Sequence, residues 1–350
     1  MIKKKPRQSN IELLRILSML LIVIYHFLKH SIIPNTPNLI YITNPLIAVL
    51  HSGVICFILI SGYWGIKFSL KGFAKLFLYC AFYSVIIYVI AVLLDPSIWN
   101  VYEGLSLILP IQWWFIPVYM CLYLLTPVIN IPLKSASNQT KLFFILILIL
   151  VSFCFGQFIP SLEFGKNPIN FILIYYVGNY LRTGLILSKN YNAKKLLGIY
   201  ILFVFLLFSS MLFGYLYIPN VGKILFRLFY PYNSIGLIIN SVLFFLIFTK
   251  IKFSSKLINW FSSSTLAVYL IHENQYLSHY LYDFVIKLQN NIDNYVVLAF
   301  TIVILAILVF VVSVLIDKLI SPLFQILIRF ITESNIFIKV DDRIQDLLKF

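Results

Sequence analysis

The chain has 350 residues, of which 61% are hydrophobic, 17% aromatic and only 11% charged. Water-soluble globular proteins carry about 25% charged residues, and disordered chains are poor in aromatic ones, so this composition excludes both classes. The net charge of +15 comes without a basic run suited to a nucleic-acid groove. We therefore expect membrane lipid among the partners, and no nucleic acid.

Apolar segments that approach the length needed to cross a bilayer follow one another along the chain. Hydropathy predicts about ten membrane-spanning helices, at residues 11–30, 44–66, 73–94, 112–132, 141–160, 168–188, 196–218, 233–250, 263–286 and 295–327. The dyad alternation of a membrane β-barrel is absent, so the predicted fold is an all-α, polytopic membrane helical bundle. Residues 1–331 form the predicted transmembrane domain, and residues 332–350 a short cytoplasmic C-terminal tail.

The basic residues predict the orientation of this bundle. If the N-terminus is inside, 21 of the 27 Lys and Arg residues lie in cytoplasmic segments. Five lie in outer segments, namely Lys29, Lys166, Lys223, Arg227 and Lys287. Because Lys and Arg gather in cytoplasmic loops, we predict that both termini are cytoplasmic.

The first predicted span contains three ionisable residues, Glu12, Arg15 and His26. Ionisable groups inside a span are costly and are functional candidates by default. At 100° per residue, Arg15 and His26 point within about 20° of the same direction and lie about 16 Å apart along the axis. Glu12 is one turn before Arg15 and can pair with it. This pattern predicts a path for an anionic group that enters from the cytoplasm.

The segment from Asn10 to Arg15, followed by ten residues and His26, resembles the first-helix signature of the membrane acyltransferase-3 family, the bacterial O-acyltransferases of polysaccharides and related substrates. Three later blocks are similar to family segments in the same order: residues 57–63, the tryptophan-rich residues 112–127, and residues 266–272. The resemblance implies a multi-pass protein of the bacterial cell membrane. It also implies a cytoplasmic acyl-CoA donor, usually acetyl-CoA, with no permanently bound cofactor; the cysteine pattern indicates no metal.

Acyl transfer to a hydroxyl needs a base, or a nucleophile that carries the acyl group. We expect His26 to act as the general base or, alternatively, as a transient acyl carrier, because histidine titrates near neutral pH. Arg15, Lys71 and Lys75 are expected to hold the CoA phosphates. Lys71 and Lys75 stand where the family commonly has an R-x-x-R pair, and lysine lacks the bidentate geometry of arginine.

Two further groups are candidates for binding the acceptor. Trp113 and Trp114 could form a platform on which a sugar stacks, or they could belong to the interfacial tryptophan belt. His272 and Glu273 belong to a polar cluster within the ninth predicted span, which could bind the acceptor or make structural contacts.

The sequence thus predicts an integral membrane O-acyltransferase that moves an acyl group, expected to be acetyl, from acyl-CoA to a hydroxyl. The acceptor is expected to be a cell-surface polysaccharide, or its lipid-linked precursor as a glycolipid. The alternative is a transporter or flippase of a lipid-linked glycan. Transporters often carry inverted repeats and Gly- or Pro-broken helices, whereas this chain has 13 Gly and no visible repeat.

Overall fold

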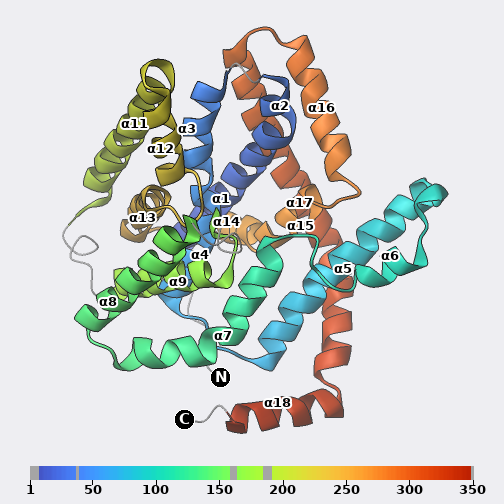
Figure 1. Ribbon diagram of the computed structural model, residues 1–350. Coiled ribbons are helices and arrows are strands. Elements are labelled where there is room, and N and C mark those ends of the chain that lie inside the picture. Colours follow the sequence, from blue (N-terminus) through green and yellow to red (C-terminus); the bar gives the residue numbers. More distant parts are fainter. Residues whose placement is uncertain (1–7, 37–38, 158–163, 184–190, 348–350) are drawn as a thin grey trace.

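The computed structural model describes residues 8–36, 39–157, 164–183 and 191–347. Across these ranges the chain forms helices and no strand, so the prediction of an all-α fold is confirmed (Figure 1). The main helices are α1 (Ser9–Phe27), the π-helix η1 (Leu28–Ile32), α2 (Ile33–Asn35), α3 (Ile40–Leu50), α4 (Ser52–Trp64), α5 (Leu70–Leu94), α6 (Val101–Ser106), α7 (Phe115–Ser135), α8 (Asn138–Ile149), η4 (Leu150–Cys154), α9 (Pro168–Thr183), α11 (Ala193–Tyr217), α12 (Pro219–Phe229), α13 (Ile235–Lys250), α14 (Lys256–Ser262), α15 (Thr265–His272), α16 (Ser278–Asn291), α17 (Tyr295–Thr332) and α18 (Asn335–Leu347).

Serine and asparagine side chains begin many of these helices. Ser69 accepts a hydrogen bond from the amide of Gly72 at the start of α5, and Ser255 does the same for Ile258 at the start of α14. Asn294 accepts from two amides at the start of α17. Such caps satisfy amides that have no partner inside the helix, so these polar residues fix where the apolar runs become helical.

Six helical stretches within the described part of the chain are long and apolar enough to cross a membrane. They are Ser9–Asn35, Tyr41–Trp64, Leu70–Leu94, Phe115–Ser135, Ala193–Tyr217 and Tyr295–Thr332. Two shorter apolar helices, Asn138–Cys154 and Ile235–Lys250, stand where two further spans are predicted, and α9 has 16 residues. The described residues therefore support a multi-pass bundle with six full-length candidate spans, and the predicted number of about ten is not confirmed.

The predicted continuous helix over residues 263–286 is wrong. Helix α15 ends at His272, and α16 begins only at Ser278. In the intervening turn the side chain of Asn274 accepts a hydrogen bond from the amide of Tyr276 at 3.0 Å, and Asn274 itself is fully buried. Asparagine side chains compete with the helix for backbone groups in this way, so the helix ends here without a glycine or proline.

Close contacts at glycines hold α1, α4 and α9 together in the centre of the bundle (Figure 1). A Cβ atom on Gly53 would collide with the carbonyl oxygen of Ser18, and one on Gly62 with the carbonyl oxygen of Tyr175. Small residues let membrane helices approach until their backbones touch. The position of α1, which carries Arg15 and His26, is thereby fixed against α4.

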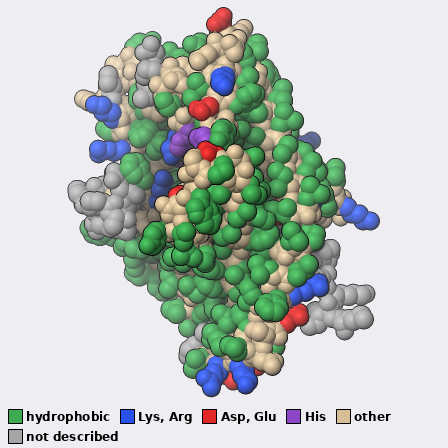
Figure 2. Space-filling view, turned by 90° about the vertical axis from the view of Figure 1, so that its right-hand side faces the viewer, with side chains coloured by type: hydrophobic (Ala, Val, Ile, Leu, Met, Phe, Trp, Pro, Cys, Tyr) green, Lys and Arg blue, Asp and Glu red, His purple; other side chains and the backbone are tan. Residues whose placement is uncertain are grey.

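The two ends of the bundle differ. Helix α18 lies across the end of α17 at the bottom of Figure 1, whereas the connection from α16 to α17 lies at the top. In Figure 2 much of the visible surface between these ends is hydrophobic, and charged side chains lie toward both the upper and the lower end. This distribution suits a bundle whose middle faces lipid.

Candidate active site

A cavity of about 350 Å³ is lined by both Arg15 and His26. Its walls are mostly apolar and aromatic and include Met19, Phe57, Tyr119, Trp114, Tyr232 and Tyr269. The prediction that Arg15 and His26 share one face of the first helix is therefore confirmed. The cavity connects the first turns of α1 with its last turn.

At the Arg15 end, the predicted pair with Glu12 is present. The Nη1 atom of Arg15 donates to both carboxylate oxygens of Glu12, at 3.0 and 3.1 Å, and the hydroxyl of Ser262 donates to the same carboxylate. Glu12 is buried, whereas 35% of the Arg15 side chain is exposed. Arg15 is thus fixed at the wall of the cavity and still has unshared guanidinium N–H groups.

A second cation, Lys318, lies near this end of the cavity. The Nζ atom of Lys318 donates to the hydroxyl of Ser263 at 2.6 Å and lies over the ring of Trp260. Ser263 lines the cavity. Lys71 and Lys75, by contrast, are exposed on the first turns of α5 and do not line the cavity, although Leu76 does.

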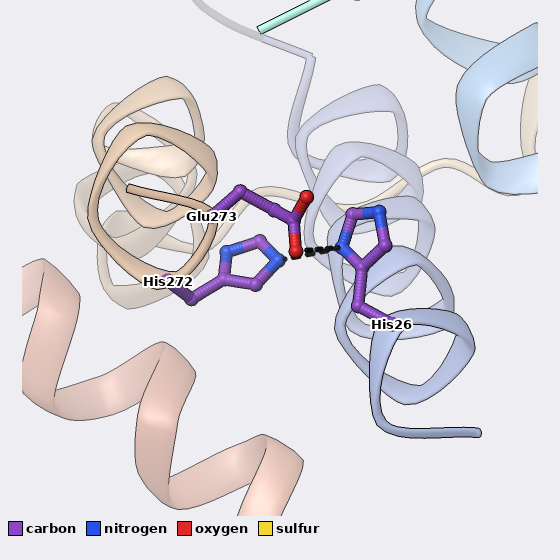
Figure 3. A group of neighbouring side chains, drawn as sticks. All are labelled: His26, His272 and Glu273. Carbon is purple, nitrogen blue, oxygen red and sulfur yellow. Dashed lines mark hydrogen bonds and ion pairs between the residues drawn. The ribbon is translucent and has the colours of Figure 1, made fainter. Parts of the chain in front are cut away.

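At the other end of the cavity, His26 meets His272, the last residue of α15, and Glu273, which follows it (Figure 3). Its Nδ1 atom lies 3.0 Å from Nε2 of His272 and 3.4 Å from Oε1 of Glu273. Both histidines are nearly inaccessible to solvent, at 6% and 2% exposure. The hydroxyl of Tyr282 donates to the same oxygen of Glu273.

The contacts of His272 define the proton positions. Its Nδ1 atom lies 2.6 Å from the carbonyl oxygen of Val268, which can only accept, so Nδ1 carries the hydrogen. The Nε2 atom of neutral His272 then accepts from Nδ1–H of His26. The other ring nitrogen of His26, Nε2, is left without a proton and points away from His272 and Glu273 in Figure 3.

A buried carboxylate fixes the start of the helix that carries His272. Asp317 of α17 is 4% exposed and accepts hydrogen bonds from Tyr79 at 2.6 Å, from Tyr83 at 2.7 Å and from Ser264 at 2.5 Å. Ser264 immediately precedes α15. Asp317 therefore ties α5 and α17 to the helix on which His272 lies.

The donor atoms of His26, His272 and Glu273 all lie within 4.8 Å of one another. Two imidazole nitrogens and a carboxylate oxygen form a ligand set that Zn²⁺ accepts in proteins. The 3.0 Å spacing of the two nitrogens is also that of a hydrogen bond, which accounts for the arrangement without an ion.

The two tryptophans occupy different positions. Trp113 is 2% exposed, and its indole N–H has no partner within the described part of the chain. Trp114 lines the cavity and contacts Tyr232, with ring centroids 5.1 Å apart. Of the pair, only Trp114 is positioned to meet a molecule in the cavity.

His51 is a further buried histidine close to His26. It is 2% exposed, lies between α3 and α4, and contacts the ring of Tyr25 at 4.4 Å. Its Nδ1 atom lies 2.8 Å from the carbonyl oxygen of Tyr230. His51 therefore packs against Tyr25, the residue that precedes His26.

A family model described as an acyltransferase domain, that of the acyltransferase-3 family, matches residues 8–317. The match begins just before α1 and ends at Asp317, so it contains every residue of the cavity named above. No curated protein and no solved structure matches the chain.

Proposed function

The chain belongs to the acyltransferase-3 family, and on that premise we propose that it is a membrane O-acyltransferase that uses acyl-CoA, with acetyl-CoA as the donor. The proposed acceptor is a hydroxyl of a cell-surface polysaccharide or of its lipid-linked precursor, and the proposed location is the bacterial cell membrane. The observation that carries this proposal is that Arg15 and His26 line the same cavity.

The donor is proposed to enter at the Arg15 end, from the cytoplasm. Arg15 and Lys318 supply cations for the CoA phosphates at that end, where charge-assisted hydrogen bonds are strong. The mostly apolar cavity suits the pantetheine arm, and the distance from Arg15 to His26 along α1 is about 16 Å. The thioester carbonyl would then lie next to His26.

The proposed reaction follows from the free Nε2 atom of His26. Nε2 takes the proton of the acceptor hydroxyl, and the oxygen attacks the thioester carbonyl. The carbon–sulfur bond breaks, and the CoA thiolate receives the proton back from the imidazolium. Glu273, 3.4 Å from Nδ1, stabilises that imidazolium while it exists.

The hydroxyls of Tyr232 and Tyr269 are candidates for stabilising the charge that develops on the carbonyl oxygen. Both residues line the cavity, and the ring of Tyr269 stacks on His26 at a centroid distance of 6.5 Å. Donors that are already in place in a dry site stabilise such an oxyanion more than water does.

A transfer assay tests the proposal. Purified protein in lipid vesicles, with labelled acetyl-CoA and surface glycans from cells that lack the protein, should release CoA and label the glycans. Arg15→Ala and His26→Ala should each abolish transfer while the amount of folded protein stays normal. His279→Ala is the matched control, because His279 lies on α16 away from the cavity.

Full activity of the Arg15 or His26 variant would contradict the mechanism. The alternative, a transporter of lipid-linked glycans, predicts glycan movement across the vesicle without CoA release. Family membership supports the enzyme over the transporter.

A further inference from the structure

We propose that the acceptor is an anionic glycan, and that Lys29 and Lys166 bind its negative charge beside the His26 end of the cavity. This inference rests on the proposed function and adds to it the chemical class of the acceptor. The anion would be a carboxylate on the sugar or a phosphate next to it, since both present oxygens to an ammonium group.

Each of the two lysines lies over an aromatic ring close to His26. The Nζ atom of Lys29 is 5.7 Å from the centre of the Tyr25 ring, and that ring is 5.1 Å from the imidazole of His26. The Nζ atom of Lys166 is 5.1 Å from the centre of the Trp114 ring, and Trp114 lines the cavity. Cation–π contacts of this kind hold both ammonium groups near the site before any ligand binds.

The local backbone presents Lys29 and its neighbour toward the residues around Glu273. Both Lys29 and His30 belong to the π-helix η1, a wide turn of the kind often found at functional sites. The ring of His30 stacks on that of Tyr282 at 4.8 Å, and Tyr282 is the residue that donates to Glu273. The π-turn therefore carries Lys29 close enough to Glu273 for the two charges to interact.

Among the described residues, the Glu273 carboxylate acts on both Lys29 and Lys166, so it offsets part of their positive charge. Within the described ranges the basic and acidic side chains in close contact are Arg15 with Glu12 and His26 with Glu273, so neither lysine lies within ion-pair distance of a carboxylate. Burial, and then the charge of Lys29, lower the pKa of the Lys166 ammonium. Two like charges that disfavour each other are stabilised by an anion that binds between them.

These lysines also stand out in the charge distribution. On the predicted topology only five of the 27 Lys and Arg residues lie on the outer side, and two of the five meet at this one site. The positive-inside rule gives no reason for cations there. In Figure 2, histidine side chains lie next to basic and acidic ones in a hollow of the upper part of the face.

The first experiment separates acceptors by charge. Glycans from cells that lack the protein are fractionated on an anion-exchange resin into neutral and retained pools, and each pool is incubated with protein and labelled acetyl-CoA. We expect label in the retained pool. Carboxyl reduction or mild acid hydrolysis of that pool then distinguishes a carboxylate from a glycosyl phosphate, because each treatment removes one of the two charges.

The second experiment assigns the lysines. Lys29→Gln combined with Lys166→Gln should raise the acceptor KM about tenfold or more, and added salt should raise the wild-type KM. The KM for acetyl-CoA should not change. Lys223→Gln and Lys287→Gln, which change two other predicted outer cations, should behave as wild type.

The outcomes separate the two proposals. Equal labelling of the neutral pool, or an unchanged acceptor KM in the double variant, would overturn the assignment of an anionic acceptor. A raised KM for acetyl-CoA would assign the lysines to the donor and also overturn it. If no pool is labelled and no CoA is released, the proposed function itself fails.

Discussion

The Nε2 atom of His272 lies 3.0 Å from Nδ1 of His26, although 246 residues separate the two along the chain. His272 is fixed in turn by the carbonyl of Val268. These two contacts together define which nitrogen of His26 carries no proton.

Loss of the His272 ring should reduce turnover without removing the base itself. His272→Ala leaves Nδ1–H of His26 without its buried acceptor, and we expect kcat to fall about 10- to 100-fold. Glu273→Gln should lower kcat as well, because the imidazolium loses its counter-charge. Steady-state kinetics with saturating acetyl-CoA measure both effects.

The two effects should not add. His272 and Glu273 act on the same nitrogen of His26, so the double variant should lose less than the product of the single losses. Wild-type kcat in His272→Ala would show that the contact with His26 has no role in turnover.

Lys318 should matter more for the donor than the two lysines that the sequence singled out. Lys318→Gln should raise the KM for acetyl-CoA about fivefold or more and leave kcat unchanged, because Lys318 lies beside the cavity at Ser263. Lys71→Gln and Lys75→Gln should have smaller effects. Lys339→Gln on α18 is the control for a general loss of charge.

The assay compares the four variants at one ionic strength. If Lys71→Gln raised the KM for acetyl-CoA more than Lys318→Gln does, the donor site would be assigned to the start of α5.

Asp317 should stabilise the fold. Asp317→Ala leaves the hydroxyls of Tyr79, Tyr83 and Ser264 without their common acceptor. We expect the free energy of unfolding to fall by about 3 kcal/mol or more, because a buried network loses its centre. Thermal unfolding in detergent measures this, and Asp283→Ala, at an exposed site on α16, should unfold like wild type. Equal unfolding temperatures for the two variants would contradict this role.

The contact of α4 with α9 should not tolerate a side chain at Gly62. Gly62→Val places methyl groups where the backbone of Tyr175 lies, so folded protein should be lost. Gly198→Val is a matched control on α11, where a Cβ atom meets no atom within 4 Å. Size-exclusion profiles of the two purified variants report the difference, and similar monodisperse peaks would argue against the tight contact.

Local periodicity was sufficient to predict the face shared by Arg15 and His26 and the pair of Arg15 with Glu12. Both depend on the geometry of one helix. The contact of His26 with His272 could not be predicted, because it depends on the helix break after His272, which no glycine or proline marks. Lys318 was missed for a similar reason: its side chain reaches Ser263, at the cavity wall, from a helix that is distant in the sequence.

Because one cavity joins Arg15 to His26, the proposed enzyme would translocate the acyl group. The acyl group would change sides of the bilayer while its CoA carrier stays where it was, so the free energy would come from the thioester and not from an ion gradient. In sealed vesicles, ionophores that collapse the proton and sodium gradients should leave the transfer rate unchanged. Free CoA should accumulate only in the compartment that received acetyl-CoA, and its appearance on the other side would rule out this form of vectorial chemistry.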